Sequence, residues 1–228
     1  RLGLKRCDFR FVLAGRMDKG DPFKEAVQRL AAQNGVPFSL EIFPDLPDDE
    51  LRAELFAAAD VFVSPVDNIQ ETFGLTVLEA YAASLPVVAS AIDGYRELVR
   101  DGESGILVPT LGPSSAAASS SLSAMLPTDV YHLYLAQQTV VEAEPFAEAL
   151  LKLAADPELR RRMGEKAREL VLAEYTWDKV ITDYRSLWDE LNAIELPDGA
   201  LERLRRARHP SLPDYLPIFR DYLSASFD

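Results

Sequence analysis

The sequence is short of cysteine and histidine, and each shortage excludes a class of site. Cys7 is the single cysteine, so no disulfide can form within the chain. The two histidines, His132 and His209, show no spacing typical of a zinc site, and no Asp-x-Asp pair is present to hold a metal-bound diphosphate. We therefore expect no metal ligands and no resident cofactor.

Positive charge is also in deficit. The chain has 24 Lys and Arg against 37 Asp and Glu, a formal net charge of −13. Nucleic-acid binding requires clustered Lys and Arg to contact the phosphates. The densest basic segment, residues 203–209, lies among acidic and apolar neighbours and is interpreted as a solvated helix face. We predict no nucleic-acid partner.

Long hydrophobic runs are absent. The longest stretch of high hydrophobicity, Phe73 to Ile92, contains Glu79 and Pro86, which favours a buried helix followed by a strand over a membrane span. No signal peptide is recognisable either. We therefore predict no transmembrane segment and a cytoplasmic location.

The composition that remains is globular: 228 residues, 48% of them hydrophobic, suffice for one large domain with an appendage. Up to residue 111, short apolar runs alternate with segments of helical periodicity, which predicts an α/β fold with a doubly wound parallel sheet. The expected strands are residues 9–14, 38–43, 59–65, 86–90 and 105–109. The expected helices are residues 22–34, 51–59, 73–84 and 95–100.

The pattern changes after residue 111. Residues 112–129 include a Ser/Ala-rich run of low complexity and are predicted to form a flexible surface loop. Additional C-terminal helices are expected at residues 145–155, 157–174 and 177–191. The predicted organisation is a core at 1–111, the loop at 112–129, helices completing the domain at 130–195, and a proline-containing tail at 196–228.

One segment carries a pattern with chemical meaning: Glu71-Thr-Phe-Gly-Leu-Thr-Val-Leu-Glu79. Glu71 precedes the expected helix, and Glu79 is the only charged residue on it. A carboxylate among apolar neighbours needs hydrogen-bond donors, which a hydroxyl-rich ligand would supply. Gly74 has no Cβ and would let a ligand approach the backbone closely.

The backbone N–H groups of Phe73, Gly74 and Leu75 would open the same helix, where its dipole favours a phosphate. A diphosphate at the helix start with a polyol near each carboxylate is the layout of a nucleotide-sugar. A structural interpretation uses the same residues, with Glu71 as an ordinary helix-start carboxylate and Glu79 paired with an arginine such as Arg96. Spacing alone leaves both interpretations open.

The segment from Glu71 to Pro109 resembles the nucleotide-sugar-binding core of retaining glycosyltransferases of family 4, also called group 1. Further matches are Ala58-Ala-Asp-Val-Phe-Val-Ser-Pro65 and the stretch from Asp156 through Trp177, so the resemblance extends over roughly residues 8–191. It implies the Rossmann-like, C-terminal half of the two-domain GT-B fold.

The resemblance also implies roles for individual residues. Glu79 would accept hydrogen bonds from the ribose hydroxyls of the donor, and Glu71, the implied catalytic residue, would hold hydroxyls of the transferred sugar. Three positions, Pro44, Ser84 and Asp93, stand where the family often has glycine. The implied donor-binding residues are Glu71, Thr72, Phe73, Gly74, Leu75 and Glu79.

The implied activity is metal-independent transfer of a sugar, with retention of configuration, from a UDP-, GDP- or ADP-sugar to an acceptor hydroxyl. The chain resembles only the donor-binding half, so we expect it to be inactive alone. It would need an N-terminal acceptor-binding domain, in the same full-length chain or a separate subunit, and any membrane contact would be made through that half. Two alternatives remain: a non-catalytic nucleotide-sugar-binding or assembly module, and a sugar-nucleotide epimerase.

Overall fold

The computed structural model describes residues 9–15, 23–33, 38–44, 49–67, 73–112, 125–195, 197–200 and 202–203. The chain divides into two compact units, Arg1–Thr176 and Trp177–Asp228. The first unit is an α/β structure, as the alternation of strands and helices predicts, and the second contains helix α9 (Trp177–Asn192).

A three-stranded parallel sheet forms the centre of the first unit. Its strands are β3 (Phe62–Ser64), β4 (Val87–Ser90) and β5 (Gly105–Val108), in the order β3-β4-β5. Parallel neighbours require a crossover, which α3 (Leu75–Ala82) supplies between β3 and β4, and α4 (Tyr95–Leu98) between β4 and β5. All four residues of β4 are buried, as expected of a central strand covered on both faces.

A second parallel pair comes earlier in the chain. Strands β1 (Phe9–Gly15) and β2 (Phe38–Pro44) pair in register from Phe9 opposite Phe38 to Gly15 opposite Pro44. Helix α1 (Phe23–Gln33) connects them, and α2 (Asp49–Ala58) follows β2. These elements match the predicted strand-helix-strand order at the start of the chain.

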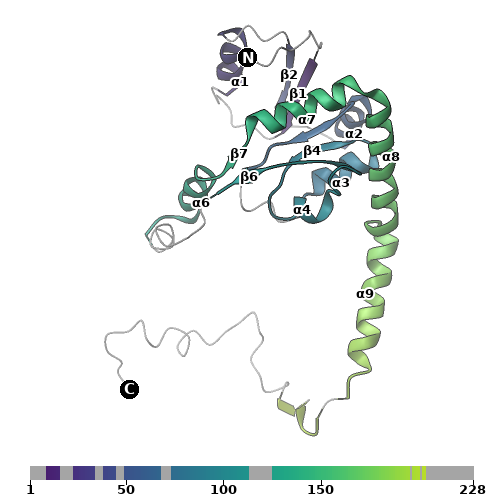
Figure 1. Cartoon of the computed structure of the whole chain (residues 1–228). Coiled ribbons are helices and arrows are strands. Elements are labelled where there is room, and N and C mark those ends of the chain that lie inside the picture. The colour runs from purple at the N-terminus through teal and green to yellow at the C-terminus, as the bar shows by residue number, and fades with distance from the viewer. Residues whose placement is uncertain are drawn as a thin grey trace. The chain divides into compact units, whose positions relative to one another are not determined.

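The core lies on both faces of the central sheet. Val87 and Ala89 of β4 belong to a buried cluster with α3, whereas Val88, pointing the other way, belongs to a cluster with Leu153 of α7 (Ala143–Ala155). Figure 1 shows β4 between α3 and α7. Since helices cover both faces, the sheet is doubly wound.

Helix α8 (Pro157–Glu174) contributes to both clusters, through Met163 on one side and Ala167 on the other. Its start has strong local signals: the Asp156 side chain accepts a 2.9 Å hydrogen bond from the Leu159 amide, and proline occupies the first turn. The observed start of α8 equals the predicted one for this reason, and its end also falls at the predicted residue.

Helix α6 (Thr128–Ala136) and the antiparallel strands β6 (Thr110–Leu111) and β7 (Val140–Val141) were not predicted. Two-residue strands leave no periodicity in a sequence, and α6 is apolar without a distinct stripe. Helix α6 begins inside the segment predicted as a loop, while residues 113–124 of that segment lie outside the described residues.

In the second unit, α9 ends one residue beyond its predicted end, and most of the predicted tail lies outside the described residues. Among the helices that the structure describes, none combines the length and the apolar composition that crossing a membrane requires.

Candidate functional site

The start of helix α3, at the carboxyl edge of the parallel sheet, is organised by Gly74. This residue caps the helix in the left-handed region, at φ +88° and ψ +50°, where only glycine is unstrained. A Cβ at this position would also lie 2.7 and 2.9 Å from two ring atoms of Tyr95. Glycine is therefore required by the backbone and by the ring beneath it, two reasons that the sequence analysis did not identify. Ligand access through this glycine remains an expectation.

Tyr95 connects this turn to the ends of two strands. Its hydroxyl lies 2.7 Å from the Ser64 Oγ at the end of β3, and the Ser90 hydroxyl at the end of β4 donates a 3.4 Å hydrogen bond to the Ser64 carbonyl. All three side chains are buried. The turn before α3 thus packs on the hydrogen-bonded side chains of Tyr95, Ser64 and Ser90, which hold it in place without a ligand.

The hydrogen bonds of the first turn of α3 begin at the Gly74 carbonyl. The Gly74 carbonyl accepts from the amides of Val77 at 3.0 Å and Leu78 at 3.4 Å, which leaves the amides of Leu75 and Thr76 with no acceptor among the described residues. A helix start with open amides carries a partial positive charge and is a favourable place for an anion.

Glu79 lies on α3, just over one turn beyond its start, and its environment differs from the prediction. Its side chain is 36% exposed rather than enclosed by apolar residues, and Oε1 lies 3.5 Å from Arg52 Nη2 of α2. The structural interpretation anticipated an arginine partner and named Arg96, but the partner is Arg52. The carboxylate is therefore charge-compensated and still reachable by a ligand.

The other predicted site residues are placed as follows. Phe73 is exposed, with its ring edge toward Tyr175 at a centroid distance of 6.3 Å, and the Leu75 side chain is exposed at the helix start. Glu71 and Thr72 lie outside the described residues. Of the predicted set, the structure thus brings together Phe73, Gly74, Leu75 and Glu79.

Sequence reasoning missed the supporting residues Arg52, Tyr95 and Ser64. One signal was present: two serines, Ser64 and Ser90, each end a short apolar strand. Buried hydroxyls at adjacent strand ends need hydrogen-bond partners, which is a reason to expect polar groups beside them. No comparable local signal pointed to Arg52.

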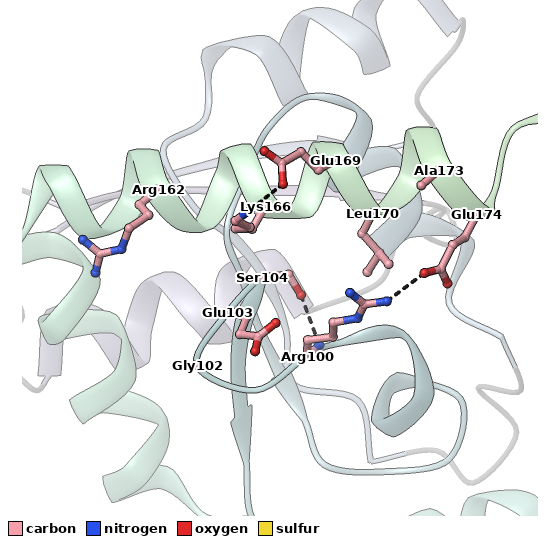
Figure 2. Close-up of a pocket in the computed structure, with 10 residues that line it drawn as sticks. All are labelled: Arg100, Gly102, Glu103, Ser104, Arg162, Lys166, Glu169, Leu170, Ala173 and Glu174. Atoms are coloured by element: carbon pink, nitrogen blue, oxygen red, sulfur yellow. Dashed lines mark hydrogen bonds and ion pairs between the residues drawn. The ribbon is translucent and has the colours of Figure 1, made fainter.

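A cavity of about 550 Å³ lies elsewhere, between the turn at residues 100–104 and α8. Figure 2 shows the Arg100 guanidinium directed at the Glu174 carboxylate, at 2.7 Å, and Lys166 directed at Glu169, at 2.5 Å. The turn precedes β5, which places the cavity at the amino edge of the sheet, opposite the start of α3. Its charges are largely paired with one another, so it is separate from the candidate site.

A smaller cavity, of about 310 Å³, lies at the carboxyl edge, beside the residues that follow β4 and β5. Ile92, Leu111 and Leu135 line it with two threonines, and it offers no charged group. Within the described part of the chain, no three His, Cys, Asp or Glu residues gather as metal ligands would.

Comparison with known proteins adds to this geometry. The profile of the family described as glycosyl transferases group 1 matches residues 2–124, and that of glycosyl transferase-like proteins matches residues 116–186. D-inositol 3-phosphate glycosyltransferase of Thermomonospora curvata is 41% identical over 107 residues, which are 47% of this chain and 24% of that protein. Alpha-maltose-1-phosphate synthase of Mycolicibacterium smegmatis is 32% identical over 169 residues, which are 74% of this chain and 36% of that protein.

Among solved structures, sucrose-phosphate synthase from Thermosynechococcus elongatus is similar with a TM-score of 0.55 and 26% identity, over 80% of this chain and 38% of that one. The chain thus spans well under half the length of these proteins. The first family match covers more than half of the chain. The chain belongs to the glycosyl transferases of group 1, and its fold is the Rossmann-like α/β half of a GT-B enzyme.

Proposed function

We propose that this chain is the donor-binding domain of a retaining glycosyltransferase, which presents a nucleotide-sugar to an acceptor hydroxyl. The observation that carries the proposal is the start of α3: the amides of Leu75 and Thr76, which have no acceptor among the described residues, follow the buried Gly74 turn, with Glu79 on the same helix. Four residues separate Leu75 from Glu79, about 6 Å along the axis at 1.5 Å per residue. The distance between the phosphates and the ribose hydroxyls of a nucleoside diphosphate is similar to this one.

In this proposal, the amides bind the diphosphate and Glu79 accepts hydrogen bonds from the ribose. When the bond between the sugar and the diphosphate breaks, the electron pair goes to the phosphate oxygen. The amides and the helix dipole then stabilise the growing negative charge, and the rigid turn keeps them in position. Because these groups neutralise charge without a cation, metal independence is part of the proposal, as are retention of configuration and the sugar-binding role of Glu71.

The acceptor belongs to a second domain in this proposal. The relatives' names refer to different small molecules, D-inositol 3-phosphate and alpha-maltose-1-phosphate, although each protein is similar to a large part of this chain. Such variation is expected if the acceptor is chosen outside the donor-binding half. We accordingly propose that the chain does not turn over alone and works with an acceptor-binding domain in the cytoplasm.

Calorimetric titration of the 228-residue chain with UDP, GDP and ADP, and with their glucose and mannose conjugates, tests the proposal. One base should be preferred, and Glu79→Ala should weaken its binding about tenfold, the loss of roughly 1.4 kcal/mol from a charge-assisted hydrogen bond. Glu158→Ala, which removes an exposed carboxylate from α8, serves as the matched control. Failure of every nucleotide to bind, or equal binding by the Glu79→Ala variant, would contradict the donor site.

A further inference from the structure

The ion pair between Arg52 and Glu79 joins two helices that each supply one distinctive charge. Arg52 is the only basic residue of α2, whose other charged residues are acidic. Glu79 is the only charged residue of α3. The single cation of one helix thus meets the single carboxylate of the other, so the contact does not arise from a generally charged surface.

The geometry leaves most of the carboxylate available. Nη2 of Arg52 lies 3.5 Å from Oε1 of Glu79, which is beyond the usual N–H···O hydrogen-bond distance. Both oxygens of Glu79 therefore keep lone pairs for other donors. The two side chains are 45% and 36% exposed, so a ligand can approach the carboxylate while the arginine stays beside it.

Arg52 also forms an ion pair within its own helix. The same Nη2 lies 3.0 Å from Oδ1 of Asp49, three residues earlier on α2. This second contact restricts the guanidinium to a position in which it remains close to Glu79. A guanidinium has no acceptor atoms and cannot replace the carboxylate as a partner for hydroxyl hydrogens.

We infer that Arg52 is a positioning residue for ribose recognition. It holds the Glu79 side chain in the orientation in which the carboxylate accepts hydrogen bonds from the two ribose hydroxyls of the donor nucleotide. This inference rests on the proposed function, because it requires Glu79 to contact the ribose. It assigns to α2 a part in selecting a ribonucleotide over a deoxynucleotide.

The experiment measures that selection directly. The full chain is titrated with the nucleoside diphosphate that it binds tightest among UDP, GDP and ADP, and with the 2′-deoxy and 3′-deoxy forms of the same nucleotide. The ratio of the deoxy to the ribo dissociation constant is compared for wild type, Arg52→Ala, Arg52→Lys and Glu79→Ala. Arg161→Ala, which removes an exposed arginine paired with Glu158 and Glu165 on α8, is the matched control.

Arg52→Ala should weaken binding of the ribonucleotide by about threefold to fivefold, as expected for a partly exposed ion pair, and weaken binding of each deoxynucleotide less, because each keeps only one hydroxyl for Glu79. The ratio of the deoxy to the ribo dissociation constant should therefore fall toward one. Arg52→Lys should restore part of it, and the double variant with Glu79→Ala should bind like Glu79→Ala alone. A purely structural role would instead weaken all three nucleotides equally.

The outcomes separate the inference from the proposed function. If Glu79→Ala lowers the ratio of the deoxy to the ribo dissociation constant but Arg52→Ala does not, the positioning role is overturned and the donor site stands. If Arg52→Ala tightens ribonucleotide binding, the arginine competes with the ligand and the inference is also overturned. If Glu79→Ala leaves the ratio unchanged, or no nucleotide binds, the proposed site is wrong and the inference falls with it.

Discussion

A Cβ on Gly164 of α8 would lie 1.9 Å from the carbonyl oxygen of Ser84, directly after α3. Helix α8 therefore approaches the segment that follows α3 at backbone distance. Gly164 is buried, and no rotation of a side chain could relieve the clash, because the backbone fixes the position of a Cβ and the contacted atoms of Ser84 belong to the backbone.

Gly164→Ala should destabilise the protein although alanine is the better helix former. The gain in helix propensity is about 1 kcal/mol, whereas overpacking against a backbone oxygen costs about 3 kcal/mol, so we expect a net loss of about 2 kcal/mol. Denaturant unfolding monitored by circular dichroism measures it. Arg162→Ala, on an exposed position of the same helix, should stay within about 0.5 kcal/mol of wild type.

Ser84→Gly should stabilise the protein. Among the described residues, Ser84 at φ +60° and Asp93 at φ +40° are the only non-glycine residues with positive φ. Both stand where the family that the sequence resembles often has glycine. Removing the Cβ relieves about 1 kcal/mol of left-handed strain, and the melting temperature should rise. Ala83→Gly, at φ −85°, is the control and should lower it. A lower melting temperature for Ser84→Gly would contradict the strain argument.

Tyr95→Phe should destabilise the turn before α3. The change removes the hydroxyl that lies 2.7 Å from Ser64 Oγ and leaves that buried serine without this partner, at a cost of about 1 to 3 kcal/mol. Ser64→Ala in the same background should add little, because the two substitutions remove one shared interaction. A double-mutant cycle by thermal unfolding measures the coupling. Additive losses would mean that the two hydroxyls act independently.

Tyr81 should make the stability depend on pH in the alkaline range. Burial raises the pKa of Tyr81 to about 12 from its usual 10.0, against the opposing effect of its 2.6 Å hydrogen bond with Ser104. The unfolded chain therefore loses this proton first as the pH rises. The stability contributed by the neutral phenol is complete below about pH 10 and is lost as the pH rises toward 12, by about 3 kcal/mol.

Free energies of unfolding measured between pH 9 and 12 test this prediction. The fall in stability should be shallower in Tyr81→Phe than in wild type, even though the variant starts from lower stability after losing the hydrogen bond. Tyr184→Phe, on an exposed tyrosine of α9, should keep the wild-type slope. Parallel curves for wild type and Tyr81→Phe would show that Tyr81 does not titrate differently on unfolding.

The places that the structure gives to the predicted donor-site residues can be traced to particular features of the sequence. The glycine before a long apolar helix marked the start of α3, and Phe73, Gly74, Leu75 and Glu79 lie there as expected. The burial of Glu79 was overestimated, because the apolar residues beside it in the sequence do not show how much of its side chain the folded protein leaves exposed. They also do not show that Arg52 of α2 lies next to it. Periodicity likewise could not reveal β6, β7 and α6, which are short or uniformly apolar.

The sequence by itself determined the order and type of the elements from β1 to β5 and the start of α8, because caps, turn glycines and hydrophobic periods act within a few residues. Only the tertiary structure decided that Arg52 rather than Arg96 meets Glu79, and that the ring under Gly74 belongs to Tyr95. Those contacts join segments far apart in the chain, and they depend on how the helices pack against the sheet, which no local pattern specifies.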